Sequence, residues 1–340
     1  MSSKHLHKNI PIFIPHMGCP HACVFCDQRT ISGHSDFSLN EVDREIKTAL
    51  ATLPKGAVAE IAYFGGSFTA IDRGLMMRLL DLAQGYVDTG KVSGIRFSTR
   101  PDAVGEDVLD ILSRYTVSAI ELGLQSMDDT VLSFCRRGHT AAQAEDACRR
   151  IVARGYALVG QMMIGLPGST HESELATAKR ICELGAVAAR VYPTVVFDGT
   201  ALATWMRSGQ YAPLTNEAAA ERSAYALDVF ERNGVELLRV GLCASDGLSS
   251  DAAIGGANHP ALGEMAYGAL FYRRMTQAME ERGIAWQGRE VTFYVPRGKT
   301  SQAVGQHRVN AKRLTETFGL SRVNIKESDQ LTGTQVVLSE

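Results

Sequence analysis

The chain has 340 residues, of which 45% are hydrophobic and 21% charged, and its formal net charge is −2. This composition is typical of a globular enzyme with one large domain or one domain plus a small appendage, and the total charge indicates neither a nucleic-acid nor a membrane partner. No run of about 18 apolar residues occurs and the first residues do not resemble a secretory signal, so we expect a cytoplasmic protein without a membrane partner. Seven unevenly spaced cysteines argue against a secreted disulfide framework.

Apolar runs alternate with helical patterns over the first 200 residues. The predicted strands lie at 10–16, 59–66, 94–100, 118–126, 156–165 and 188–196, and the predicted helices at 40–53, 73–86, 105–114, 141–154 and 171–185. Nearly continuous apolar strands between helices are typical of a parallel β-sheet covered by helices. Such units could form a doubly wound sheet or a partial barrel, and both place the functional loops at the carboxyl ends of the strands.

The pattern changes after residue 197. A long helix is predicted at 216–234, a strand at 235–242 and another helix at 261–282. From 284 onward the sequence predicts a strand, two short helices around a polar turn, and two further strands. We therefore expect two domains, residues 1–283 and residues 284–340.

Three cysteines, Cys19, Cys23 and Cys26, have the spacing C-x3-C-x2-C directly after the first predicted strand. A loop this short can direct three sulfur atoms at one centre, and thiolates favour iron–sulfur clusters or zinc. Three protein ligands would leave one corner of a four-iron cluster open. Zinc with His16 or His21 as a fourth ligand is the competing interpretation, and scattered core cysteines are a further one.

The cysteine motif, with Phe25 just before its third cysteine, resembles the signature of the radical S-adenosylmethionine (SAM) superfamily. The resemblance implies an α/β fold, a partial (β/α)6 barrel of the TIM type, with a [4Fe-4S] cluster and SAM as cofactors. Cys19, Cys23 and Cys26 would bind the cluster, and Phe25 would lie against the adenine. In that family, one electron from the cluster cleaves SAM to give a 5′-deoxyadenosyl radical. A reductant such as flavodoxin or ferredoxin is the implied partner.

Two segments resemble the family's SAM-binding motifs but lack their acids. "YFGGSFT" at 63–69 resembles the Gly-Gly-Glu motif that binds the methionine amino group, through Gly65 and Gly66, with Ser67 in place of the acid. In "FSTRPD" at 97–102, Ser98 stands where relatives carry a glutamate. Arg100 and Asp102 of that segment could instead form a pair that structures the loop.

"ELGLQSMDDTVLSFCRRGHT" at 121–140 resembles a stretch in oxygen-independent coproporphyrinogen oxidases and in the catalytic subunit of Elongator. By this resemblance Gln125 binds the ribose and Arg137 the carboxylate of SAM. An amide suits a pair of hydroxyls and a guanidinium suits a carboxylate. The alternative for Arg137, next to Arg136, is a solvated helix end. Gln161 in the fifth strand is a further predicted ribose contact.

Residues 190–215 and 258–267 resemble the Elongator-type branch in particular. The resemblance makes Tyr192, at the end of the sixth strand, a predicted substrate contact and catalytic residue. The segment after 284 is too short for the acetyltransferase domain of the Elongator subunit, so we expect that domain to be absent.

The C-terminal segment is basic. Seven Lys or Arg residues and one acid, Glu316, lie between residues 297 and 326, which is an electrostatic pattern suited to phosphate. The segment also resembles a KH module, which clamps nucleic acid on a Gly-x-x-Gly turn; here the turn is residues 305–308 and lacks the second glycine. The alternative is an ordinary solvated face. The predicted nucleic-acid contacts are Arg297, Lys299, Arg308, Lys312 and Arg313.

The sequence therefore predicts a radical SAM enzyme that acts on RNA, with a tRNA base as its substrate. One alternative is a radical enzyme for a small molecule such as a tetrapyrrole. The other is a non-enzymatic RNA-binding protein with a structural metal site.

Overall fold

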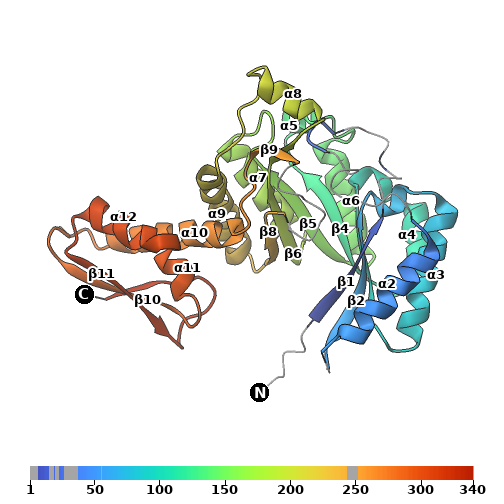
Figure 1. The fold of residues 1–340 in the computed structure, drawn as a ribbon, viewed down its shortest axis with the longest axis horizontal. Coiled ribbons are helices and arrows are strands. Elements are labelled where there is room, and N and C mark those ends of the chain that lie inside the picture. The colour runs from blue at the N-terminus through green and yellow to red at the C-terminus, as the bar shows by residue number, and fades with distance from the viewer. Residues whose placement is uncertain are drawn as a thin grey trace.

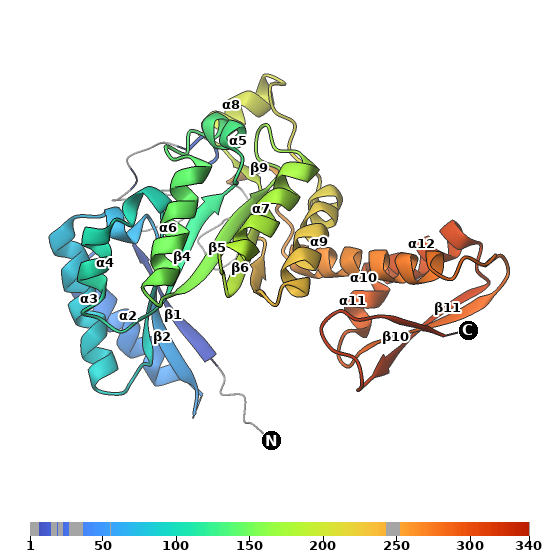
Figure 2. The same cartoon turned by 180° about the vertical axis from the view of Figure 1, so that it is seen from behind.

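One curled sheet of seven parallel strands forms the body of the protein (Figures 1 and 2). The computed structural model describes residues 7–14, 19, 23–26, 37–54, 56–242 and 252–339. The strands follow one another across the sheet in chain order: β1 (His7–Ile14), β2 (Val58–Gly65), β3 (Gly94–Thr99), β4 (Val117–Gln125), β5 (Ala157–Ile164), β6 (Ala188–Pro193) and β8 (Glu236–Val240). This sequential order is that of a barrel rather than of a doubly wound sheet. The predicted partial barrel is confirmed, and β8 adds a seventh parallel strand to the six predicted units.

Helices cover the convex face of the sheet. The main ones are α2 (Leu39–Thr52), α3 (Arg73–Asp88), α4 (Glu106–Leu112), α6 (Ala141–Ala153), α7 (His171–Glu183) and α9 (Asn216–Arg232). Each turns one apolar stripe toward the sheet; in α6 the buried residues are Ala144, Ala147, Cys148 and Ile151, spaced at intervals of three and four. Thr140 and Gln143 form a capping box that fixes where α6 begins.

Short elements complete the rim at the carboxyl ends of the strands. They are two 3₁₀ turns, η1 (Phe68–Ala70) and η2 (Pro101–Ala103), two short helices, α5 (Asp129–Phe134) and α8 (Ala201–Arg207), and an antiparallel pair, β7 (Val195–Phe197) with β9 (Ala253–Gly256). None of the helices in the described part of the chain is long and apolar enough to cross a membrane.

The two faces of the sheet differ in polarity because strand side chains alternate with a period of two. In β4, Leu122 and Leu124 pack into the hydrophobic core beneath the helices. Glu121, Gly123 and Gln125 face the concave side and line a cavity there. The alternation therefore places polar side chains inside the barrel while the convex face stays apolar.

Helix α10 (Leu262–Glu280) extends from the barrel and carries a C-terminal unit (Figure 1). The unit consists of β10 (Glu290–Pro296), α11 (Thr300–Val304), the turn η3 (Gln306–Arg308), α12 (Val309–Phe318), β11 (Arg322–Ser328) and β12 (Val337–Ser339). Strand β10 lies between β11, to which it is parallel, and β12, to which it is antiparallel. The hydrophobic cluster of this unit includes Phe271, Met275 and Met279 of α10. The domain boundary at 283/284 stays a prediction, since α10 packs into both cores.

The turn between α11 and α12 has glycine-like backbone although it lacks the second glycine. His307 has a φ of 51° and Arg308 a φ of 61°, both in the left-handed region that favours glycine. Arg308 therefore occupies the place of the expected glycine with a glycine-like conformation.

Asn310 links the C-terminal unit to α10. Its buried Nδ2 donates to the carbonyl oxygen of Gly268 in α10 at 2.8 Å and to that of Ala303 in α11 at 3.0 Å. Asn310→Ala leaves both buried carbonyls without this donor, so we expect the free energy of unfolding to fall by about 2 kcal/mol. Urea denaturation measures the change. Glu316→Ala, an exposed change in the same helix, is the control; an equal effect of the two substitutions would contradict this role of Asn310.

Candidate functional site

A cavity of about 420 Å³ opens on the concave side of the sheet, at the carboxyl ends of the strands. All of the barrel residues predicted as cluster, SAM or substrate contacts line it: Cys19, Cys23, Phe25, Cys26, Gly65, Gly66, Ser67, Ser98, Gln125, Arg137, Gln161 and Tyr192. The structure thus brings together side chains that are up to about 170 residues apart in the sequence. Their individual roles stay predictions.

Residues 23–26 of the cysteine loop are held against the rim of the barrel through Val24. Its N–H donates to the carbonyl oxygen of Cys135 at 3.2 Å, and its own carbonyl oxygen accepts from the N–H of Leu202 at 2.8 Å. Its side chain packs into a small apolar cluster that includes Cys135. His16 and His21, the proposed fourth ligands of a zinc site, lie outside the described residues.

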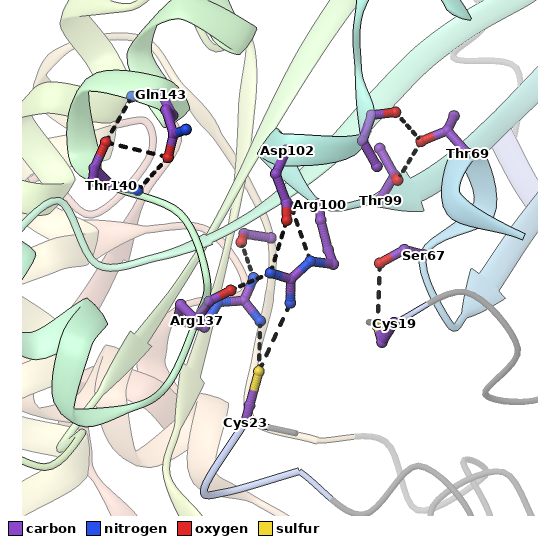
Figure 3. A network of polar contacts seen from close by, with 12 residues as sticks. Cys19, Cys23, Ser67, Thr69, Thr99, Arg100, Asp102, Arg137, Thr140 and Gln143 are labelled. Atoms are coloured by element: carbon purple, nitrogen blue, oxygen red, sulfur yellow. Dashed lines mark hydrogen bonds and ion pairs between the residues drawn. The ribbon is translucent and has the colours of Figure 1, made fainter. Parts of the chain in front are cut away.

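Two guanidinium groups converge on the sulfur of Cys23 (Figure 3). Arg137 Nη1 lies 3.3 Å from Cys23 Sγ, and Arg100 Nη1 lies 3.9 Å from it. Asp102 holds Arg100 with two hydrogen bonds of 2.9 and 3.1 Å, so the predicted loop-structuring pair is present. Burial alone would lower the pKa of Arg100, but the ion pair with Asp102 raises it. A buried, permanently charged group therefore points at Cys23, a predicted cluster ligand, and no sequence motif indicates this contact.

The same surroundings keep two nearby titratable groups neutral. Burial, together with the charge of Arg137, lowers the pKa of His139 to about 4, so this imidazole is uncharged near neutral pH. Burial raises the pKa of Cys135 to about 12, so its thiol stays protonated and is a poor metal ligand. Cys243 lies outside the described residues.

The paired glycines close the end of β2 against the end of β1. Gly65 has a φ of 101°, and a Cβ at this position would lie 2.4 Å from the carbonyl oxygen of Ile14. The N–H of Gly66 donates to that same oxygen at 3.2 Å. Glycine at position 65 is thus required by this close approach. Ser67, which follows, has its Oγ 3.3 Å from Cys19 Sγ, so the hydroxyl that replaces the family's acid contacts a cysteine.

Gln125 and Arg137 present unpaired polar atoms in this region. Gln125 Oε1 and Arg137 Nε are buried and have no hydrogen-bond partner in the described part of the chain. Arg137 Nη2 is committed to the carbonyl oxygen of Gly123 at 2.5 Å. A buried acceptor and a buried donor without partners cost free energy unless a ligand pairs with them. A ligand that carries hydroxyls and a carboxylate, as SAM does, matches both.

The three cysteines reach the same cavity, as ligands of one cluster must. Among the described residues, no three His, Cys, Asp or Glu side chains are placed to hold one metal ion. In a four-iron cluster each thiolate binds a different iron atom, so the sulfurs need not meet at one point. Cys19, Cys23 and Cys26 all line the cavity, which meets that looser requirement.

The predicted nucleic-acid contacts lie apart from this cavity, on the C-terminal unit. Arg308 and Lys312 are exposed on the α11–α12 turn and on α12. Lys299 lies over the ring of Tyr267 at 5.3 Å, and Arg313 over that of Tyr272 at 4.0 Å. Arg297 is highly exposed and 3.6 Å from Asp329, a weak surface pair.

Comparison with known proteins assigns the family. The model of the Radical SAM superfamily matches residues 13–181, and that of the Radical_SAM C-terminal domain matches residues 187–270. The chain belongs to the radical SAM superfamily and is a radical SAM enzyme, whose cofactors are a [4Fe-4S] cluster and SAM. The interpretations as a zinc protein or a non-enzymatic RNA-binding protein are therefore wrong.

The chain is similar in sequence to two archaeal proteins and in fold to a solved structure. It is 30% identical to the uncharacterized protein MJ0486 of Methanocaldococcus jannaschii over 60% of this chain and 66% of that protein. It is 25% identical to the tRNA uridine(34) acetyltransferase of the same organism over 73% of this chain and 53% of that enzyme. The matched regions thus span between about half and two thirds of these relatives. The structure of Elp3 from Methanocaldococcus infernus shares the fold, with a TM-score of 0.63 and 21% identity over 82% of this chain and 64% of that chain.

The contacts around Cys23 predict a shift in the cluster's reduction potential. Hydrogen bonds and positive charge near a cluster sulfur stabilise the reduced, more negative state and raise the potential. Arg100→Met should therefore make the midpoint potential of the reconstituted cluster more negative, as measured by an anaerobic redox titration followed by electron paramagnetic resonance. Arg114→Met, which removes an exposed arginine elsewhere, should leave it unchanged. An unaltered potential in Arg100→Met at full iron content would show that Arg100 does not act on the cluster.

Proposed function

We propose that this enzyme modifies a base of tRNA. The observation that carries the proposal is the similarity to a tRNA uridine(34) acetyltransferase over 73% of the chain. That similarity reaches an enzyme whose name specifies a tRNA base, but it spans only 53% of that enzyme's length. We therefore infer a tRNA base as the substrate of this chain from that partial similarity.

The residues of the cavity supply the parts that such a reaction needs. When bound, the cluster and SAM supply a 5′-deoxyadenosyl radical that abstracts hydrogen from the substrate. Cys19, Cys23 and Cys26 would hold the cluster. The SAM contacts would be Phe25, Gly65, Gly66, Ser67, Ser98, Gln125, Arg137 and Gln161.

Tyr192 would contact the substrate deeper in the barrel. Burial raises the pKa of its hydroxyl, which is hydrogen-bonded to Arg190, so Tyr192 is a neutral phenol near pH 7. A neutral hydroxyl can donate to or accept from a base edge. Such a group positions a substrate without adding charge.

The C-terminal basic side chains support an RNA substrate. In the described part of the chain, no ion pair joins Lys299, Arg308, Lys312 or Arg313 to an acid. Cations without acidic partners remain available to phosphate, and the adjacent rings of Tyr267 and Tyr272 offer surfaces on which bases stack. The surface therefore suits single-stranded or looped RNA.

The reaction also requires an electron and a reducing environment. We propose a low-potential donor such as flavodoxin or ferredoxin, and a cytoplasmic location. The reason is chemical: thiolate ligands and a reducible cluster persist where the surroundings keep cysteines reduced.

The direct test is anaerobic incubation of the reconstituted enzyme with SAM, dithionite and total tRNA, followed by nucleoside mass spectrometry. We expect a nucleoside of altered mass that is absent when Cys23→Ala replaces the wild type. Since the donor is supplied chemically, the result does not depend on a protein partner. Efficient SAM cleavage with no altered nucleoside from any tRNA would refute a tRNA substrate and leave a small molecule such as a tetrapyrrole.

Charge reversal at the C-terminal surface tests how RNA binds. Arg308, Lys312 and Arg313 changed together to Glu should weaken tRNA binding by at least tenfold and flatten its salt dependence, because fewer phosphate counterions are released. Filter binding at several salt concentrations measures both effects. Changing Arg44 and Arg114, which are exposed on the barrel, to Glu is the matched control. Equal affinities of the two variants would mean that this surface does not bind tRNA.

A further inference from the structure

A chain of ion pairs crosses the barrel interior, nearer the amino ends of the strands than the cysteine loop. Arg96 Nη1 lies 3.4 Å from Glu60 Oε2, and Arg96 Nη2 lies 3.2 Å from Glu121 Oε1. Arg190 Nε in turn lies 2.8 Å from Glu121 Oε2. These side chains are largely buried, and their charges alternate. The pairs neutralise one another, as buried charges must.

Arg239 lies next to the last arginine of this series but has no acidic partner among the described residues. In the sheet, Arg239 of β8 is the register partner of Arg190 in β6, so two arginines stand side by side. Both line the cavity. Within the described part of the chain, the guanidinium of Arg239 forms no hydrogen bond or ion pair. The last guanidinium of the series is therefore uncompensated, and a half-buried cation of this kind is stabilised by an anion.

The surroundings of Arg239 suit an oxyanion on an otherwise weakly polar molecule. Gln161 and Tyr192 line the same part of the cavity, and each carries a hydrogen-bond donor. Phe13 and Phe64, whose ring centroids are 6.3 Å apart, contribute an apolar wall. The cavity thus combines the unpaired guanidinium of Arg239, beside the Arg190–Glu121 ion pair, with neutral donors and an aromatic surface.

The position of Arg239 also makes it reachable. Strands β1 and β8 are the two edges of the sheet and are not hydrogen-bonded to each other. Arg239 lies on one of these edges. Because its side chain also lines the cavity and is only partly buried, Arg239 can be reached from the cavity.

We propose that Arg239, assisted by Arg190 and Tyr192, binds an oxyanion of the substrate. This proposal rests on one part of the proposed function, namely that the substrate reacts inside the barrel. The oxyanion is either the phosphate of the target nucleotide or the carboxylate of a small organic acid. In both cases it fixes how far the substrate extends into the barrel.

Isothermal titration calorimetry tests the proposal. The anaerobically reconstituted enzyme, with SAM present, is titrated separately with inorganic phosphate, with succinate and with uncharged succinamide. We expect saturable binding of phosphate or succinate but not of succinamide. Arg239→Gln should weaken it by about tenfold or more, since a charge-assisted hydrogen bond is lost. Arg239→Lys should retain part of the affinity, and Arg114→Gln, an exposed arginine on the outside of the barrel, should retain all of it.

The outcomes separate this proposal from that of tRNA modification. Tighter binding of phosphate than of succinate identifies a nucleotide as the source of the oxyanion, and the reverse identifies an organic acid; both support the subsite. Loss of anion binding in Arg239→Gln, without any altered tRNA nucleoside in the wild type, would uphold the subsite and refute the tRNA substrate. No saturable anion binding by the wild type, or equal binding by Arg239→Gln and Arg114→Gln, would overturn the subsite itself.

Discussion

The contact of two buried arginines with the sulfur of Cys23 organises the mouth of this barrel. The three residues come from the loop after β1, the end of β3 and the segment between α5 and α6, so one sulfur ties together three distant parts of the chain. Each arginine is held from a second side, Arg100 by Asp102 and Arg137 by the carbonyl oxygen of Gly123. Of the two, Arg137 has no acidic partner among the described residues, and a buried cation without a counter-charge is costly. A thiolate at Cys23, the predicted cluster ligand, would supply that negative charge.

The alternation of side chains along the strands explains how one sheet serves both stability and chemistry. Outward residues such as Leu122 and Leu124 bury apolar area against the helices. Inward residues form layers: the ion pairs that end in Arg190, with Arg239 and Tyr192 beside it, lie nearer the amino ends, and the cysteine loop lies at the mouth. The order of these layers follows from strand register alone, because side chains two residues apart face the same way.

Much of this arrangement could be predicted from the sequence. The six strands and the intervening helices were predicted within a few residues, because apolar runs and helical periodicity are local signals. The residues around the cavity were found through short motifs, since the loops after parallel strands must meet at one edge of the sheet. The seventh barrel strand was predicted as a strand but not as part of the sheet, because the connection from β6 to β8 contains β7, α8 and α9 and so departs from the strand–helix alternation of the first six strands.

The inward charges were missed for a different reason. Arg190 and Arg239 each stand singly within apolar segments, where a lone charged residue is not distinctive. The signal that could have found them is their position: like Glu121, they fall on the inward face of strands whose other face is apolar. Arg100 was interpreted only as a partner of Asp102, since no spacing rule links it to a cysteine 77 residues earlier.

The central claim is that this cavity holds a cluster on three cysteines and uses it to cleave SAM. It is tested most directly by measuring iron content and 5′-deoxyadenosine formation in anaerobically reconstituted wild type and in Cys23→Ala under dithionite reduction. The account predicts about four irons per wild-type chain and SAM cleavage by the wild type, with both reduced or absent in the variant. Equal cleavage by Cys23→Ala, or a wild-type protein that binds zinc and no iron, would contradict it.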